Sequence, residues 1–172
     1  KGLLTTAIRD DDPVIFFEHK TLYGLQGEVP EGDYLVPFGK ARIVSEGDDC
    51  TLVATGRMVS FCEDAAKALS ADGISCDIID PRTTSPLDED AILDSVEKTG
   101  RLIVVDETPP RCSFAADVAA LAASEVFSSL KAPVKTVTGP HSPVPFAKEL
   151  ETAFLPSPVK IKSVIEQTVN FS

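Results

Sequence analysis

Hydrophobic and polar positions along this chain switch between the period of a strand and the period of a helix. Residues 51–55 form a short apolar, β-branched run that stops at Gly56, and apolar residues then recur at helical spacing up to Leu69. A strand, a tight turn and a helix in this order are typical of a parallel α/β sheet, whose usable surface lies at the carboxyl ends of its strands. The unit at 51–69 is therefore predicted to be the first crossover of the fold.

The same unit recurs downstream. A second strand is predicted at 74–80, followed by a helix that Ser85 caps, that has Pro86 at its first position and that Gly100 closes. Further apolar runs predict strands at 102–105 and 133–138 and helices at 113–130, 146–153 and 158–169. This alternation predicts an α/β fold with an open, mostly parallel sheet in three αβα layers and right-handed crossovers.

The first forty residues do not follow this pattern. They contain an apolar helix stripe at 2–10, a continuous apolar run at 14–17 that predicts a buried strand, and many glycines and prolines from 21 to 39. A strand predicted at 41–46 then leads into the sheet. We therefore divide the chain into a helix-strand remnant of a preceding domain (1–20), a loop-rich linker (21–40) and a three-layer domain (41–172).

The charge excludes some classes of partner. A formal net charge of −11 and a pI near 4.5 argue against binding to nucleic acid or an anionic membrane, and favour either a solvated acidic surface or a basic protein partner. No apolar run approaches the roughly 20 residues that cross a bilayer, so the default prediction is a cytoplasmic or matrix protein. Four cysteines without C-x-x-C spacing are interpreted as reduced packing residues: Cys50, Cys62, Cys76 and Cys112.

Motifs for chemistry are scarce. The turn at 55–58 has neither G-x-G-x-x-G nor P-loop spacing, and a G-x-S-x-G elbow is absent. The one conceivable thiol–imidazole pair is Cys112 with His141, although Cys112 also suits a small cap-region residue. Three other residues keep two interpretations each. His19 faces a cleft or an interface, and Arg57 and Arg82 bind an anion or form salt bridges.

An acidic cluster follows the first helix. The carboxyl end of a helix carries partial negative charge, which favours lysine or arginine, yet Asp10, Asp11 and Asp12 gather there. Two interpretations remain open at this point: a solvated acidic loop, and a cation held by free carbonyls and an aspartate oxygen.

Motifs spread over the whole chain carry a family resemblance. They are Asp12–Lys20 with Leu22-Tyr23, Val36–Ala41, Asp80–Asp88 and Ser95–Arg101. In combination they resemble the β subunit of the thiamine-diphosphate-dependent 2-oxoacid dehydrogenase complexes. Within that family, Gly27–Pro30, Pro110–Ser113 and Pro140–Phe146 look most like the acetoin-cleaving enzymes.

The resemblance implies a transketolase-type C-terminal domain that is preceded by the last helix and strand of a pyrimidine-binding domain. It implies an α2β2 assembly that holds thiamine diphosphate and magnesium between subunits and passes an acyl group to a lipoyl acyltransferase core. The family's activating glutamate and active-site histidine belong to an amino-terminal half outside this sequence. We therefore expect no catalytic or cofactor-binding residue here, and no activity from this fragment alone. The alternatives are a pyruvate or branched-chain dehydrogenase β subunit, or an interaction module without a catalytic share.

The resemblance also implies two sites on this chain. A potassium site is expected at Ala7, Ile8, Asp10 and Asp12, through backbone carbonyls and a side-chain oxygen. A docking surface for the basic subunit-binding domain of the acyltransferase is expected to involve acidic side chains, the terminal carboxylate, and the residues His141, Phe171 and Ser172. His141 stands where pyruvate-type members usually have an acid.

Overall fold

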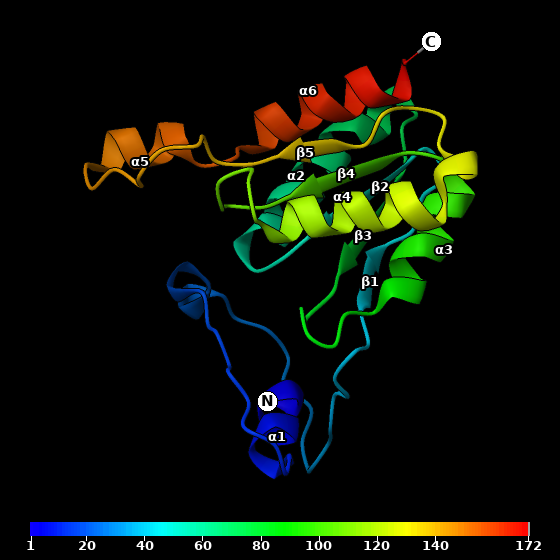
Figure 1. Ribbon diagram of the computed structural model, residues 1–172. Helices are drawn as coiled ribbons and strands as arrows, with labels where there is room; N and C mark the ends of the chain where they lie inside the picture. Colours follow the sequence, from blue (N-terminus) through cyan, green and yellow to red (C-terminus); the bar gives the residue numbers. More distant parts are fainter. Residues whose placement is uncertain (172) are drawn as a thin grey trace.

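The computed structural model describes residues 1–171 and contains a five-stranded sheet in the order β1-β3-β2-β4-β5 (Figure 1). The strands are β1 (Arg42–Ser45), β2 (Cys50–Ala54), β3 (Cys76–Asp80), β4 (Leu102–Val105) and β5 (Lys135–Val137). The α-helices are α1 (Gly2–Arg9), α2 (Arg57–Leu69), α3 (Glu89–Thr99), α4 (Phe114–Glu125), α5 (Lys148–Phe154) and α6 (Pro158–Val169). Short 3₁₀ turns are η1 (Lys20–Gly24), η2 (Ser70–Asp72) and η3 (Phe127–Ser129).

Strand pairing confirms the mostly parallel sheet. β2 lies at its centre and pairs in parallel with both β3 and β4, and β4 pairs in parallel with β5. Only β1 runs antiparallel, along the outer edge of β3. Every residue of β2 and β4 is buried, as expected for parallel strands that helices cover on both faces.

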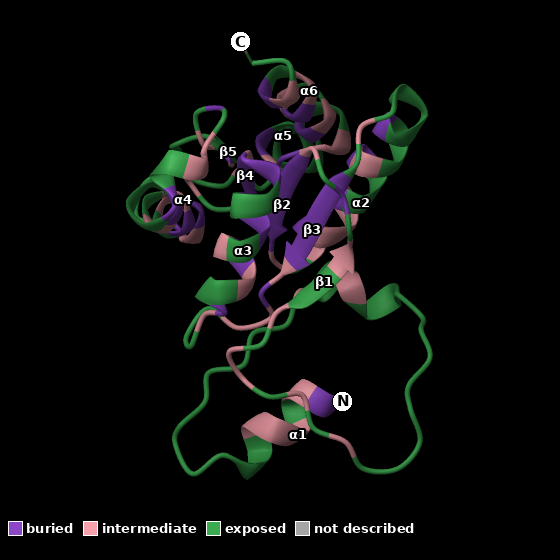
Figure 2. Ribbon diagram, turned by 90° about the vertical axis from the view of Figure 1, so that its right-hand side faces the viewer, coloured by how far each residue is buried: buried purple, intermediate pink, exposed green. Residues whose placement is uncertain are grey.

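Two hydrophobic cores lie between the sheet and the helices of the two outer layers. On one face, α2 and α6 pack against the sheet through Met58, Cys62, Leu69, Ile161 and Ile165. On the other face, α3 and α4 pack through Ile92, Val96, Ala115, Val118 and Ala122. Figure 2 shows the buried central strands between these helices. The predicted three-layer αβα architecture is therefore confirmed.

The predicted start of the helix that Gly100 closes, at Ser85–Pro86, is wrong. α3 begins at Glu89 and not at Ser85–Pro86, which lie in a loop where the Thr83 hydroxyl donates to the Pro86 carbonyl at 2.7 Å. The residue before α3 does not cap it either. The carboxylate of Asp88 instead accepts the backbone N–H of Ala41 at 2.8 Å. A long-range contact with Ala41, directly after the linker, thus takes the carboxylate that the local pattern assigns to a capping box.

The buried strand predicted at 14–17 is also wrong. These residues are in no strand, and Ile15 and Phe17 are 80% and 90% exposed. A strand needs backbone partners along at least one edge, and no other segment within residues 1–171 pairs with this one. The apolar sequence of 14–17 therefore indicates a surface that is suited to burial but is not buried within this chain.

The amino-terminal segment packs on the linker. The Thr6 hydroxyl donates to the Val36 carbonyl at 2.7 Å, and the Arg9 guanidinium pairs with Asp33 at 2.6 Å. Lys1 donates to the carbonyl of Pro30 at 2.8 Å. Figure 1 shows this part of the chain apart from the sheet layers. The domain division at residues 20 and 40 stays a prediction.

A second projection extends from the carboxyl end of β5. Residues 139–147 and α5 form an arm that leaves the body of the molecule (Figure 1). Its one buried helix residue is Phe154, whose ring lies against Gly139 so closely that a Cβ there would collide with it. Phe146 is fully exposed. The two ends of the arm therefore contact each other through Phe154 and Gly139, and Phe146 between them is exposed to solvent.

Replacement of Gly47 by alanine should destabilise the fold. Gly47 lies buried in the β1–β2 turn, where an added Cβ would collide with the backbone of Ser75 and Cys76. We expect the free energy of unfolding to fall by about 2–4 kcal/mol because backbone cannot move aside as a flexible side chain can. Chemical denaturation of Gly47→Ala and of the wild type would measure the difference in the free energy of unfolding. The matched control is Gly24→Ala, which has open space around it and should change the value by less than about 0.5 kcal/mol. Equal losses in both variants would contradict the close approach.

Candidate functional site

The strand order creates a switch point between β2 and β4. From β2 the chain passes to α2 on one face of the sheet, and from β4 it passes to α4 on the other face. The carboxyl ends of these two adjacent strands therefore open outward, and ligands of open α/β sheets bind at this type of position. Thr55 and Gly56 follow β2, and Asp106 and Glu107 follow β4.

His19 reaches this switch point from the amino-terminal segment. Its Nε2 lies 3.0 Å from Oε1 and 3.2 Å from Oε2 of Glu107. Its Nδ1 accepts the backbone N–H of Thr21 at 3.3 Å, which leaves the hydrogen of a neutral ring on Nε2. Nε2 therefore donates to the Glu107 carboxylate. Of the two interpretations of His19, contact between segments is the one that this geometry supports.

The neighbouring Asp106 has a structural role. Its buried carboxylate accepts the backbone N–H and the hydroxyl of Thr108 at 3.0 and 2.6 Å, and the N–H of Ala115 at 3.3 Å. These contacts fix the loop that leads into α4. Three donors engage Asp106, whereas among residues 1–171 the Glu107 carboxylate forms hydrogen bonds with His19 alone.

The two arginines at strand ends contact the chain itself. The guanidinium of Arg57 lies 4.7 Å from the centre of the Phe61 ring. Arg82 donates through Nε and Nη2 to the Lys40 carbonyl at 3.0 and 2.6 Å, and through Nη2 to the Ala41 carbonyl at 3.1 Å. Arg82 thus fastens the end of the linker to the β3–α3 loop. The structural interpretation of both arginines is the better supported one.

The cysteines differ in accessibility. Cys50, Cys62 and Cys76 are buried, as predicted, but Cys112 is exposed, so its interpretation as a packing residue is wrong. It precedes Ser113, whose hydroxyl caps α4 by accepting the N–H of Ala116 at 3.2 Å, and this cap keeps Cys112 outside the helix. No hydrogen bond joins Cys112 to His141 within the described part of the chain. The structure does not bring this conceivable pair together.

A second polar cluster surrounds Asp77. Its carboxylate accepts the N–H of Gly47 and the hydroxyl of Ser95, both at 2.7 Å, and pairs with Lys98 at 2.6 Å. Burial raises the pKa of Asp77, but the hydrogen bonds from Lys98, Ser95 and Gly47 outweigh it and hold the pKa below its usual value. A hollow of about 270 Å³ lies beside this cluster. Three donors within the chain engage the Asp77 carboxylate, so its role is to hold the fold together.

The expected cation residues lie at the exposed end of α1. The helix ends at Arg9, and the carboxylate of Asp10 accepts the N–H of Asp12 at 3.0 Å. Ile8 is 75% exposed, and Asp12 is exposed. Among residues 1–171, no three His, Cys, Asp or Glu side chains gather as a metal site. The potassium site at Ala7, Ile8, Asp10 and Asp12 stays a prediction, because it relies mainly on backbone carbonyls.

The expected docking residues lie at opposite ends of the sheet domain. His141 follows β5, whose end contacts the start of α6 through Lys160 and the Thr138 carbonyl at 3.3 Å. Phe171 follows the other end of α6, where the Thr168 carbonyl accepts from Arg101 at 3.2 Å. Ser172 lies outside the described residues. The structure therefore does not bring His141 and Phe171 together.

The surface around Phe171 is apolar. A hollow of about 430 Å³ is lined by Ala123, Phe127, Leu130, Lys131, Ala132, Pro133, Val134 and Phe171. None of these residues is acidic, and residues 126–148 contain no aspartate or glutamate. Acidic docking contacts near Phe171 would have to come from other segments.

None of the helices in residues 1–171 is long and apolar enough to span a membrane.

Comparison with known families decides the assignment. The model of the transketolase C-terminal domain matches residues 39–161. The chain belongs to the transketolase C-terminal domain family. A split-gene transketolase, described as an inactive β4 tetramer, has the same fold with a TM-score of 0.69 and 24% identity, over 83% of this chain and 45% of that one. The transketolase C-terminal fold that was expected from sequence is therefore confirmed.

Curated relatives of this transketolase C-terminal domain include β subunits of dehydrogenases. Identity is 56% to the acetoin:2,6-dichlorophenolindophenol oxidoreductase β subunit of Bacillus subtilis, over 95% of this chain and 48% of the relative. It is 53% to the same subunit of Cupriavidus necator, over 98% and 50%. It is 44% to a pyruvate dehydrogenase E1 β subunit of Rickettsia bellii, over 97% and 51%. The chain spans about half the length of these relatives, and its resemblance to the β-subunit family is confirmed.

Thiol labelling should distinguish one cysteine from the other three. Burial raises the pKa of the Cys76 thiol to about 12, with a further rise from Asp49 and Asp77, and burial also raises the pKa values of Cys50 and Cys62. We expect a chromogenic disulfide reagent near pH 8 to label Cys112 alone in the folded protein. All four thiols should react in denaturant, and Cys112→Ser should abolish native labelling. Rapid reaction of a second native thiol would contradict this burial pattern.

Proposed function

We propose that this domain is the carboxyl-terminal half of the β subunit of an acetoin dehydrogenase, an oxidoreductase that depends on thiamine diphosphate. The observation that carries the proposal is the difference in identity among relatives. It is 53–56% to the two acetoin-type β subunits, but 42% and 44% to β subunits of 2-oxoisovalerate and pyruvate dehydrogenases. Cleavage of acetoin with transfer of the acyl group to lipoyl groups is the proposed reaction, in the cytoplasm. Pyruvate and branched-chain 2-oxoacids are the alternative substrates.

The domain does not itself fit thiamine diphosphate. The diphosphate is an anion that proteins hold through a metal ion and closely spaced backbone amides. Residues 1–171 show no three-membered group of metal-ligating side chains, and the turn after β2 lacks phosphate-binding glycine spacing. We therefore place the cofactor and its magnesium on the other half of the proposed subunit and on the α subunit. This domain is expected to be inactive alone.

The exposed amino-terminal segment supports a larger proposed subunit. Ile15, Phe17 and Tyr23 are between 67% and 90% exposed, which is unfavourable for large apolar side chains in water. In the proposal, residues 1–20 are the last helix and strand of a pyrimidine-binding domain, and 14–17 pair with strands of that domain. Residues 21–40 link it to the domain at 41–172. The potassium site at Ala7, Ile8, Asp10 and Asp12 would take its remaining ligand from there.

The proposed partners are an α subunit, a second β subunit and the lipoyl acyltransferase core. The net charge of −11 supports association with a basic subunit-binding domain. Because His141 and Phe171 lie at opposite ends of the sheet domain, the proposed docking surface centres on Phe171 and Ser172. His141 then belongs to another contact, made by the arm of residues 139–147 and α5 on which it lies.

Substrate assays on the assembled enzyme test the proposal. The full-length β subunit, expressed with its α partner, should cleave acetoin in the presence of thiamine diphosphate and an artificial electron acceptor. We expect kcat/KM for acetoin to exceed the values for pyruvate and 2-oxoisovalerate by at least about 10-fold. Cleavage of pyruvate without cleavage of acetoin would overturn the acetoin assignment and favour the pyruvate alternative.

Binding of the acyltransferase should weaken as salt rises. Titration of the assembled enzyme with the basic subunit-binding domain is expected to give a Kd that increases several-fold between about 50 and about 500 mM salt. The control is Phe171→Ala, which should weaken binding without changing the dependence on salt. Binding that does not respond to salt would contradict docking by charge.

A further inference from the structure

One pair of titratable side chains lies at the switch point and is not needed by the packing of the sheet. A Cβ on Gly56, directly after β2, would lie 3.7 Å from Cδ2 of the His19 ring, and Glu107 directly follows Asp106 at the end of β4. The His19–Glu107 pair therefore lies between the two loops that diverge to opposite faces. This is the position at which the topology of an open α/β sheet presents a ligand.

The pair is accessible and has unused hydrogen-bonding capacity. The side chains of His19 and Glu107 are 28% and 30% exposed, so a small molecule can reach them. A carboxylate offers about four acceptor positions. Within residues 1–171, Nε2 of His19 is the one hydrogen-bond donor to the Glu107 carboxylate. Glu107 can therefore accept a further hydrogen bond from a hydroxyl group without losing His19.

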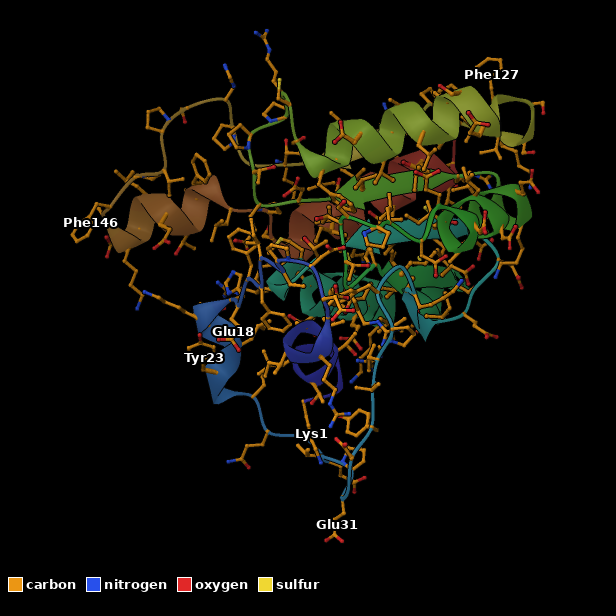
Figure 3. All side chains as sticks on the ribbon, turned by 60° about the horizontal axis from the view of Figure 1, so that its bottom comes forward. Lys1, Glu18, Tyr23, Glu31, Phe127 and Phe146 are labelled. Atoms are coloured by element: carbon orange, nitrogen blue, oxygen red, sulfur yellow. The ribbon has the colours of Figure 1, made fainter. Side chains whose placement is uncertain are left out.

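Apolar side chains next to the pair indicate that it becomes enclosed. Phe17 is two residues before His19 and is 90% exposed, and Tyr23 on the following turn is 67% exposed. The Tyr23 hydroxyl donates to Glu18 at 3.0 Å, and Figure 3 shows these two side chains together at the surface. If the rest of the proposed subunit covers this apolar surface, the pair loses water. Electrostatic interactions with a ligand then become stronger.

With a neutral His19 ring, the pair carries one negative charge. The ring of His19 has Nδ1 as an acceptor and Nε2–H as a donor, so in its neutral form the pair carries the charge of the Glu107 carboxylate. Glu18 and Asp106 adjoin His19 and Glu107 in sequence and are also acidic; of the nearby cations, Lys20 follows His19, and the guanidinium of Arg57 lies over the Phe61 ring. A ligand with its own carboxylate would be repelled here, and a neutral ligand with a hydroxyl group would be bound.

We propose that the His19–Glu107 pair contacts the substrate of the assembled enzyme and selects neutral hydroxyketones over anionic 2-oxoacids. This inference rests on the function proposed above. The carboxylate of Glu107 accepts a hydrogen bond from the substrate hydroxyl, and His19 holds the carboxylate in place. A 2-oxoacid has no such hydroxyl and brings a second negative charge to Glu107.

Glu107→Gln tests this selection in the full-length β subunit assembled with its α partner. The substitution keeps the size of the side chain and removes its charge. We expect the ratio of kcat/KM for acetoin to that for pyruvate to fall by at least about 10-fold. Calorimetry should show that methyl acetylphosphonate, an anionic analogue of pyruvate, binds the variant at least about 5-fold more tightly than the wild type. The matched control, Glu125→Gln at the exposed end of α4, should change neither quantity.

The outcomes separate the inference from the proposed function. A wild-type enzyme that does not cleave acetoin would overturn the function. A wild-type enzyme that cleaves acetoin, with the same substrate ratio in Glu107→Gln, would overturn the inference alone and leave the pair as a structural clamp. If Glu107→Gln does not assemble, Glu107→Asp keeps the charge and retracts it by one methylene. That variant should raise KM for acetoin by at least about 5-fold, and an unchanged KM would overturn the selection.

Discussion

The fold depends on one buried carboxylate, Asp77 at the second position of β3. A buried charge is costly unless several donors satisfy it, and here three residues from two parts of the chain supply the donors: Gly47 in the β1–β2 turn, and Ser95 and Lys98 on α3. The hydroxyl of Ser95 lies 2.7 Å from that of Thr51 on β2. A single side chain thus fixes the edge strand, the central strands and one covering helix relative to each other. The apolar cores then fill the space that this arrangement defines.

The sequence predicted the parts of the fold whose pattern is local. The strand at 51–55 and the helix up to Leu69 were predicted correctly because burial on both faces leaves a continuous apolar run and packing on one face leaves a helical period. The strand at 14–17 failed because apolar sequence reports a tendency to be buried but does not supply a partner. The cap at Ser85 failed because the linker, distant in sequence, engages Thr83 and Asp88.

The candidate site was less predictable for the same reason. His19 and Glu107 are 88 residues apart, and although His19 lies in the motif Asp12–Lys20, Glu107 belongs to none of the motifs identified in the sequence. One signal was present: each follows an apolar run, so each was expected at the end of a strand, and in a parallel sheet such ends share one edge. The sequence did not predict where residues 14–19 lie relative to the sheet, because they belong to none of its strands. Cys112 was misjudged because it lies before the Ser113 cap of α4, in an exposed loop, and not in the packed helix.

The antiparallel edge strand has a consequence for synthesis. β1 is made before β2 and β3, yet its only pairing partner among the described strands is β3, with β2 and α2 between them in sequence. On the ribosome β1 therefore emerges before its partner β3, and it must wait until the first crossover is complete. Unpaired apolar segments of this kind are where aggregation begins. The period of risk during folding is set by the time taken to translate the β2-α2-β3 unit.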